Sequence, residues 1–362
     1  MNFDLSEDQE LFKATSEKFF STLSVAEKVQ ARAVLPGYDR DRWGQLAELG
    51  LLSLAVSEDL GGLGGSLTDL AVIAECAGAQ NAIDPWLENG VLPVTLLART
   101  GEHPLLSDLL EGSKIAALAF AEERGRYNLR YLDTKAKSTS DGFELDGAKL
   151  FVLGGGLADY FLVTAEYEDE FALFVVPADT EGVRCRNYQI ADGSQAAIVE
   201  FSSVFVPEAD RLEIDFDTFQ GVTTKISLLA CAEMLGLSQL LLDQTVEHVK
   251  QREQFGSSIG SFQSIQHALV DCYSEVEQMR SILLRTLLHD SGPDLQRQHN
   301  VFGAKAFISE RADKIGRTAV QYHGAMGITE DVCIGAALKR VMLLSRLFGD
   351  QHHCLEQYLQ VA

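Results

Sequence analysis

A change in hydrophobic period divides this chain into three stretches. Before about residue 113 and after about residue 214, apolar residues recur every three or four positions, as on amphipathic helices. Between them they alternate or form short runs separated by turn signals such as Asp141-Gly142, Asp146-Gly147 and Gly154-Gly155-Gly156. The predicted strands are 115–120, 142–145, 149–153, 160–164, 172–176 and 196–201. The sequence therefore predicts an α+β protein with domains at 1–113, 114–213 and 214–362.

Several helices can be placed within the outer stretches. Ser6 precedes an apolar-periodic run and is a candidate N-cap, and helices are predicted over 68–78 and 301–320. One side of a further helix is continuously apolar, through Ile265, Leu269, Cys272, Val276, Met279, Leu283 and Leu287. Because so long an apolar face exceeds what a short bundle needs to cover, this helix is expected to meet another subunit.

Composition excludes several classes of partner. Hydrophobic residues make up 46% and charged residues 23%, which is typical of a globular protein. A net charge of −23 argues against nucleic acid or an anionic membrane as a partner. No signal peptide is recognisable, and no apolar run approaches membrane-spanning length. The six cysteines are dispersed, as expected of free thiols in a reducing compartment and not of a metal site. A cytoplasmic location is predicted.

The densest motif is VKQREQFGSSIGSFQSIQH, residues 249–267, which lies between two helical runs. Its Arg252, Phe255, Gly256 and Gln263 resemble the R-x-x-F-G-x-x-[IL]-x-x-[FH]-Q signature of the acyl-CoA dehydrogenases. A guanidinium presents a planar fork of donors to phosphate oxygens, and a glycine permits a tight turn. The resemblance implies that Arg252, Phe255 and Gln263 hold the pyrophosphate and adenosine end of a FAD whose flavin lies in a neighbouring subunit. The alternative is an ordinary helical corner with a surface arginine.

A second motif, QYHGAMGI at 321–328, is similar to the Q-x-[FH]-G-[GA]-x-G of the same family. The resemblance implies that Gln321, Gly324 and Ala325 lie against the ADP part of the same FAD. A glycine-rich helix end is the alternative, and His323 is expected to be packed or hydrogen-bonded, not catalytic. The family fold would comprise an N-terminal helical domain, a small central β-barrel domain and a C-terminal four-helix bundle.

The two positions at which this family carries its catalytic carboxylate hold other residues. A base over the substrate α-carbon is needed while flavin N5 takes the β-hydride. The C-terminal run Leu347-Phe348-Gly349-Asp350 places Phe348 at the usual base position, and counting back from Arg252 places Ile226 at the other. The sequence therefore predicts no catalytic base in this chain.

The flavin-ring side departs from the family pattern as well. The strand that usually ends in a hydroxyl residue reads Phe151-Val152-Leu153, and the preceding loop begins with Ala121 where a hydroxyl residue is usual. Leucine and alanine side chains cannot donate a hydrogen bond to flavin. The side that meets the ADP is thus kept, whereas the side that meets the flavin ring is lost.

This combination resembles the base-lacking subunit of the heterotetrameric (α2β2) acyl-CoA dehydrogenases that act on steroid side chains. The resemblance implies an acyl-CoA substrate, FAD, a second subunit of the same family that supplies base and flavin pocket, and an electron-accepting flavoprotein. Two alternatives stay open. One is a self-sufficient dehydrogenase or oxidase with a displaced base at Asp350 or Glu233; the other is a flavin-free acyl-CoA-binding scaffold, in which Arg252 and Gln321 would have no purpose.

Overall fold

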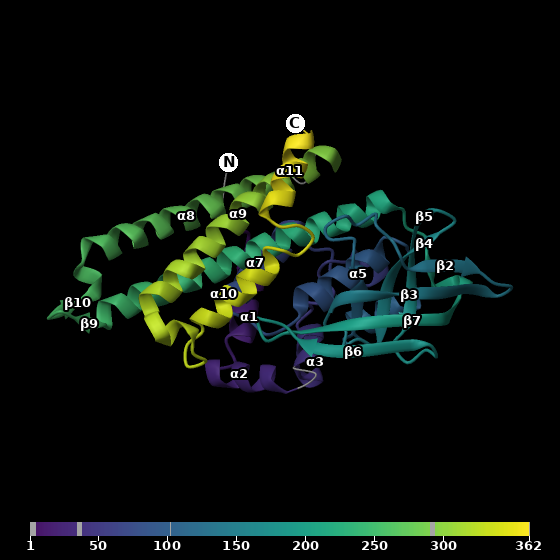
Figure 1. Ribbon diagram of the computed structural model, residues 1–362, viewed down its shortest axis with the longest axis horizontal. Helices are drawn as coiled ribbons and strands as arrows, with labels where there is room; N and C mark the ends of the chain where they lie inside the picture. Colours follow the sequence, from purple (N-terminus) through teal and green to yellow (C-terminus); the bar gives the residue numbers. More distant parts are fainter. Residues whose placement is uncertain (1–4, 35–37, 102, 290–293, 362) are drawn as a thin grey trace. The chain divides into compact units, whose positions relative to one another are not determined.

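The computed structural model describes residues 5–34, 38–101, 103–289 and 294–361 (Figure 1). Its tertiary contacts divide the chain into two compact units. Unit one comprises residues 1–30, 67–82 and 227–362, and unit two comprises residues 31–66 and 83–226. Along the chain, helices precede a β region and helices follow it, so the predicted α+β class is confirmed. The three domain boundaries themselves stay a prediction.

Unit two contains an eight-stranded mixed sheet. Its strand order is β6-β7-β3-β2-β4-β5-β8, and β1 pairs with β4 in parallel. Alternating side chains point to one face and build a core that includes Phe143, Phe161 and Phe174, with Phe143 and Phe174 packed edge to face. The strands are β1 (Ala116–Ala119), β2 (Lys135–Ser138), β3 (Gly142–Leu153), β4 (Tyr160–Tyr167), β5 (Glu170–Pro177), β6 (Val183–Gln189), β7 (Gln195–Pro207) and β8 (Arg211–Leu212). The helices of this unit include α3 (Arg40–Glu48), α5 (Leu92–Ala98) and α6 (Pro104–Leu110).

The sheet differs from the predicted strands in two ways. The runs 142–145 and 149–153 form one strand, because Asp146-Gly147 is a bulge and not a turn: the register with β7 shifts there, and Gly147 has a φ of +152°. The two-residue β8 was not predicted, and neither were β2 and β6. Their sequences, KAKS and VRCRNYQ, are polar and mostly exposed, so they lack the apolar alternation on which the prediction depended.

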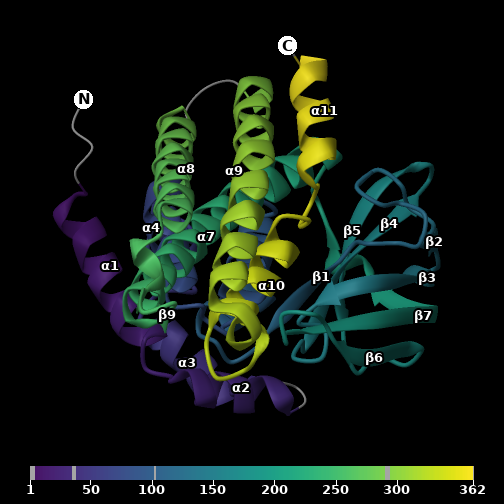
Figure 2. The same ribbon diagram turned by 60° about the vertical axis from the view of Figure 1, so that its left-hand side comes forward.

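Unit one is helical. It contains α1 (Glu7–Phe20), α4 (Leu67–Ala79), most of α7 (Phe216–Gln251), α8 (Gln263–Leu288), α9 (Asp294–His323), α10 (Ile334–Leu344) and α11 (Gln351–Val361); α2 (Val25–Ala33) lies across the division between the units. Helix α9 contacts α8, α10 and α11, and Figure 2 shows α8 and α9 side by side. Cys272, Val276, Met279 and Leu283 of the predicted apolar side of α8 are buried. Ser6 caps α1 in a capping box that is closed by Gln9.

Helices α4 and α7 touch through their backbones. A Cβ added at Gly78 would lie 2.0 Å from the carbonyl oxygen of Glu233, and one added at Gly236 would lie 2.0 Å from that of Glu75. Both positions therefore require glycine. This crossing ties a helix near the start of the chain to one that begins more than a hundred residues later.

Helix α7 corrects the expectation that no segment approaches membrane-spanning length. Within the part of the chain that the structure describes, it alone is long and apolar enough to cross a membrane, with a mean hydropathy of 1.5 over its most apolar window. That window is 83% buried inside the protein, which is the pattern of a core helix.

Candidate cofactor-binding surface

The R-x-x-F-G motif forms a short hairpin between α7 and α8. Strands β9 (Glu253–Gln254) and β10 (Ser257–Ser258) are joined by Phe255 and Gly256, whose φ angles are +54° and +81°. Two successive positive φ angles fit a type I′ turn, which usually favours Asn-Gly. Phe255 is 93% exposed at its tip. The predicted tight turn between two helices is thus a hairpin, and it presents an aromatic ring to the outside of this chain.

Arg252 has a fixed backbone and an available side chain. Its N–H donates to the carbonyl of His248 (2.9 Å), and its own carbonyl accepts from Ile259 (2.8 Å). The guanidinium is exposed and makes no hydrogen bond or ion pair with any residue that the structure describes. In a chain with 53 acidic residues, an arginine without an acidic partner is available to an external anion.

The second motif forms the turn after α9. Gln321 is exposed in the last turn of that helix, and the 3₁₀ segment η5 (Gly324–Ile328) follows. Gly324 has a φ of +61°, and a Cβ placed there would meet nothing within 4 Å. The backbone at Gly324 is therefore open, and Ala325 beside it is exposed; their contact with a ligand stays a prediction. Gln263, the first residue of α8, is also exposed. We call Arg252, Phe255, Gln263, Gln321, Gly324 and Ala325 the lending surface.

A pair of histidines joins the two motifs. The rings of His248, in the last turn of α7, and His323, the last residue of α9, stack with centroids 4.2 Å apart and planes inclined by 23°. His323 is buried, and its Nδ1 lies 2.9 Å from the carbonyl oxygen of Ala319, so the expectation that it is packed and hydrogen-bonded is confirmed. Figure 1 shows β9–β10 and the turn after α9 at the same end of the helices. Sequence reasoning did not single out His248, because no motif includes it.

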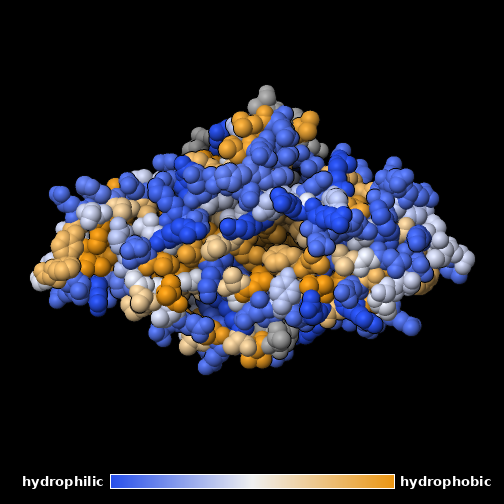
Figure 3. Space-filling view, viewed as in Figure 1, coloured by the Kyte–Doolittle hydropathy of each residue, from blue (hydrophilic) through white to orange (hydrophobic). Residues whose placement is uncertain are grey.

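This arrangement fits the diphosphate end of a dinucleotide. It combines a free guanidinium, two exposed amides, an open backbone segment and an exposed ring, which are the groups that bind phosphate and stack on a base. Figure 3 shows apolar surface at the end of the helical unit where β9–β10 lies. Phe255 of this hairpin and Phe262 shortly after it are exposed. Their rings contact each other edge to face at 6.3 Å.

Both positions at which a base is expected are buried and apolar. Ile226 in α7 is 1% exposed, and Phe348 is 7% exposed in the turn between α10 and α11. We call residues 345–350 the Phe348 turn. Lys305, itself buried, donates to the carbonyl oxygens of Leu344 (2.7 Å) and Leu347 (2.9 Å) and so fixes the start of this turn. Burial lowers the pKa of Lys305. Sequence reasoning missed this lysine, because nothing in its local pattern separates it from a surface residue.

The two candidate displaced bases have structural partners. Glu233 is buried and accepts two hydrogen bonds from Arg340, at 2.6 Å and 3.1 Å, in a buried ion pair between α7 and α10. Asp350 caps α11, since its carboxylate accepts from the N–H of His353 (2.9 Å). The carboxylate of Glu233 is thus engaged by a guanidinium, and that of Asp350 is fixed at the first turn of α11. Neither is a free base in this arrangement.

Within unit two, the strand whose end is expected to meet a flavin ring is joined by a buried ion pair, four residues before that end, to the loop that follows β1. Lys149 Nζ lies 2.6 Å from Glu122 Oε1 and 2.9 Å from Thr164 Oγ1. Burial alone would raise the pKa of Glu122, but the ammonium of Lys149 and hydrogen bonds from Asp133 and Thr134 hold it below its usual value. The loop that begins at Ala121 is therefore ordered by Glu122, although it lacks the hydroxyl, and Leu153 is buried at the strand end.

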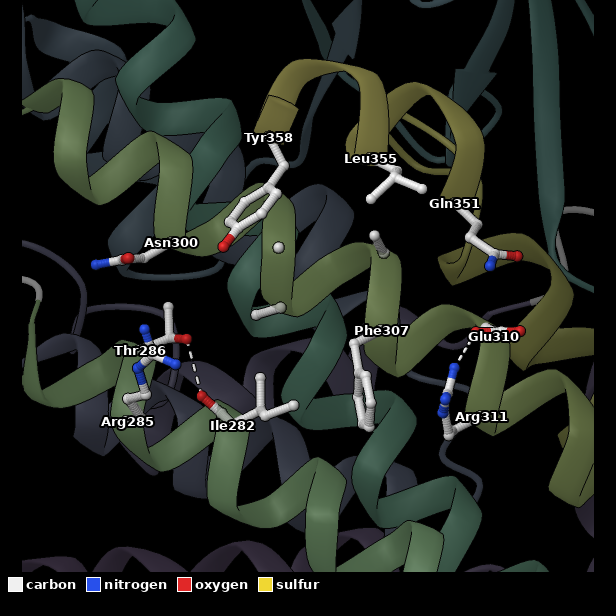
Figure 4. A pocket seen from close by; sticks show the side chains of 13 residues that line it. Ile282, Arg285, Thr286, Asn300, Phe307, Glu310, Arg311, Gln351, Leu355 and Tyr358 are labelled. Carbon is white, nitrogen blue, oxygen red and sulfur yellow. Dashed lines mark hydrogen bonds and ion pairs between the residues drawn. The ribbon is translucent and has the colours of Figure 1, made fainter. Parts of the chain in front are cut away.

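Within unit one, a cavity of about 320 Å³ lies among α8, α9 and α11 (Figure 4). Ile282, Phe307, Leu355 and Tyr358 supply much of its apolar wall. Arg311 at its edge is paired with Glu275 and Glu310 and lies over the Phe307 ring at 4.2 Å. None of the residues of the lending surface lines it.

Three family models match nearly the whole chain: the N-terminal domain of acyl-CoA dehydrogenase at residues 6–103, the middle domain at 117–204 and the C-terminal domain at 224–358. Among relatives, acyl-CoA dehydrogenase FadE27 of Mycobacterium tuberculosis is 29% identical over 305 residues, covering 81% of this chain and 80% of the relative. Among solved structures, the ChsE4–ChsE5 complex of Mycobacterium tuberculosis superposes with a TM-score of 0.90 at 25% identity and covers 99% and 98% of the two chains.

PigA, solved with FAD and proline, shares the fold with a TM-score of 0.89 at 22% identity, covering 99% and 98% of the two chains. The order of N-terminal helices, middle β region and C-terminal helices agrees with the three family models. The chain is a member of the acyl-CoA dehydrogenase family of flavoprotein oxidoreductases.

Proposed function

We propose that this chain is the subunit of a divided acyl-CoA dehydrogenase that lends the binding surface for the ADP half of a FAD. A partner subunit of the same family would supply the catalytic base and the flavin pocket, in an α2β2 complex. The observation that carries the proposal is the contrast between an exposed Arg252 without a partner and the buried, apolar Ile226 and Phe348 at both base positions.

The residues of the lending surface would act in different ways on the cofactor. Arg252 would bind the diphosphate through its guanidinium, and Phe255 would stack on the adenine from the tip of its hairpin. Gln263 and Gln321 would donate or accept hydrogen bonds, and the backbone at Gly324 and Ala325 would approach the phosphates closely. FAD bound there supplies the hydride acceptor for α,β-dehydrogenation of an acyl-CoA thioester.

This chain cannot supply the proton acceptor from either usual position. Phenylalanine and isoleucine have no titratable group, and both side chains are buried. The substrate α-proton would therefore pass to a carboxylate of the partner. The ChsE4–ChsE5 complex, at 25% identity, supports a heteromeric arrangement. The steroid acyl-CoA dehydrogenase Tcur3481–Tcur3483, at 24% identity, supports only the fold. A steroid-type acyl-CoA, an electron-accepting flavoprotein and a cytoplasmic location belong to the same proposal.

The self-sufficient alternative has less support, because Glu233 is engaged by Arg340 and Asp350 caps a helix. The flavin-free scaffold has less support because it leaves the unpaired Arg252 unexplained. Each alternative predicts a different spectrum for the purified protein.

Expression of this chain alone, and then together with a candidate partner subunit of the same family, tests the proposal. The chain alone should contain little flavin and lack dehydrogenase activity, whereas the co-expressed complex should contain one FAD per heterodimer. Flavin absorbance and subunit mass analysis give this ratio. A yellow, active single-chain assembly with one FAD per protomer would contradict the divided arrangement, and a colourless complex would favour the scaffold.

A further inference from the structure

His248 lies beside the lending surface but has no role in the function proposed above. Because the N–H of Arg252 donates to the carbonyl of His248, the two residues are one helical turn apart and on the same side of the chain. The imidazole of His248 is half-buried and makes no hydrogen bond with the residues that the structure describes. Its solvent-accessible nitrogens are therefore available to a ligand that reaches Arg252.

The stacked His323 limits where a proton can bind. Its Nδ1–H donates to the carbonyl of Ala319, so its tautomer is fixed, and the ring is buried. Two positive imidazolium rings 4.2 Å apart would repel each other strongly. Of the two rings, the more exposed His248 is the one that solvent and a ligand can reach.

Few charged groups act on His248. Burial lowers its pKa first, and the neighbouring His323 and Arg252 lower it further. The segment η5 contains no ionisable side chain, and Glu247 and Lys250 of α7 pair with each other at 2.6 Å. The hairpin adds only the exposed Glu253. In the absence of a ligand, the surroundings thus keep His248 neutral at physiological pH.

We propose that His248 is a second, proton-dependent ligand of the diphosphate bound by Arg252, so that dinucleotide binding takes up a proton. The inference rests on the proposed function of the lending surface. An anion beside Arg252 would offset the positive charge that disfavours imidazolium and would add a charge-assisted hydrogen bond. By linkage, each unit by which binding raises the pKa of His248 strengthens binding about tenfold at a pH below the ligand-free pKa.

The sign of the pH dependence follows directly. Above the raised pKa, His248 is neutral in both states and adds nothing. As the pH falls through the window between the two pKa values, only the bound state holds the proton, so affinity increases. Below the lower of the two pKa values both states hold it, and the affinity reaches a plateau.

ADP-ribose is a suitable probe, because its diphosphate is a diester that does not titrate near neutral pH and it carries no flavin. The full chain, labelled in its histidines, is titrated with millimolar ADP-ribose between about pH 8 and about pH 5.5, and the dissociation constant and the His248 resonance are followed by NMR. We expect the affinity to rise about tenfold over this range and the pKa of His248 to increase on binding. His248→Phe, which keeps a stackable ring, should bind with little pH dependence. Lys250→Gln, which removes a nearby charge outside the site, should behave like the wild type.

The outcomes separate this inference from the function on which it rests. If Arg252→Ala abolishes binding but His248→Phe keeps the wild-type pH dependence, the lending surface stands and the role of His248 is refuted. A pKa of His248 that is unchanged by the ligand would refute it as well. If ADP-ribose perturbs neither His248 nor the residues of the hairpin at any pH, the lending surface itself is contradicted.

Discussion

The lending surface and the Phe348 turn belong to the same helical unit but differ in the exposure and in the partners of their side chains. At the lending surface, polar and aromatic side chains are exposed and the guanidinium of Arg252 has no internal partner. At the Phe348 turn, the side chain is apolar and buried, and Lys305 holds the neighbouring carbonyls. The comparison teaches that the buried polar groups of this unit are committed to the fold, whereas the exposed guanidinium of Arg252 remains available to a ligand.

Among the buried polar groups of this unit, the largest effect on stability is expected at Arg340. Arg340→Ala should lower the free energy of unfolding by about 3–5 kcal/mol, because it leaves the carboxylate of Glu233 buried without its partner. Denaturant unfolding measures the change. The double variant Glu233→Gln/Arg340→Met should recover most of the loss. An Arg340→Ala protein as stable as the wild type would make Glu233 a candidate base again.

A smaller effect is expected at the lysine beside the turn. Lys305→Met keeps most of the volume but leaves the carbonyls of Leu344 and Leu347 without their donor, at a cost of about 2–4 kcal/mol. Thermal unfolding would detect it. Lys314→Met, at a lysine that is mostly exposed on the same helix, is the matched control and should cost well under 1 kcal/mol. Equal losses of stability in Lys305→Met and Lys314→Met would contradict the difference expected between a buried and an exposed lysine.

At the lending surface, the same kind of change should affect the cofactor and not the fold. Arg252→Ala in the co-expressed complex should weaken FAD retention by about 1.5–3 kcal/mol, or roughly ten- to a hundredfold, since a charge-assisted phosphate contact is lost. Flavin released on dilution measures this. The melting temperature of the chain alone should hardly change, because the guanidinium has no described partner to lose. Unchanged flavin content with a sharply lower melting temperature would mean that Arg252 is structural.

The smallest effect is expected at Phe255, where stability and flavin retention should change in opposite directions. Phe255 is poorly suited to its φ of +54°, whereas asparagine is favoured before glycine in a type I′ turn. Phe255→Asn should therefore stabilise the hairpin by up to about 1 kcal/mol while it lowers flavin retention. Hydrogen exchange of β9–β10 and flavin content are the two measurements. A variant that is both less stable and unchanged in flavin content would show that the ring serves the fold.

The sequence predicted those features that depend on local pattern. The helix over residues 68–78, the turn at Gly154 and the apolar side of α8 follow from periodicity and turn chemistry. The polar strand β6 and the bulge at Gly147 could not be predicted, because their stability comes from pairing with β7 and not from their own residues. In the candidate site, the motifs singled out Arg252 and Gly324, whose role in cofactor binding stays a prediction. The stacking of His248 on His323 brings residues 75 positions apart together, and no local pattern signals such a contact.

The crossing of Gly78 and Gly236 has a consequence for the order of events during synthesis. Helices α1 and α4 leave the ribosome long before α7, against which the backbone of α4 must lie. The last strand of unit two ends at residue 212. Its sheet can therefore form while α1 and α4 still lack contact with α7. A nascent chain of this kind exposes the side of α4 that faces α7 for the time needed to make about 150 residues, roughly eight to thirty seconds. The binding of chaperones to the nascent chain should therefore depend on how fast the residues between Gly78 and Gly236 are translated.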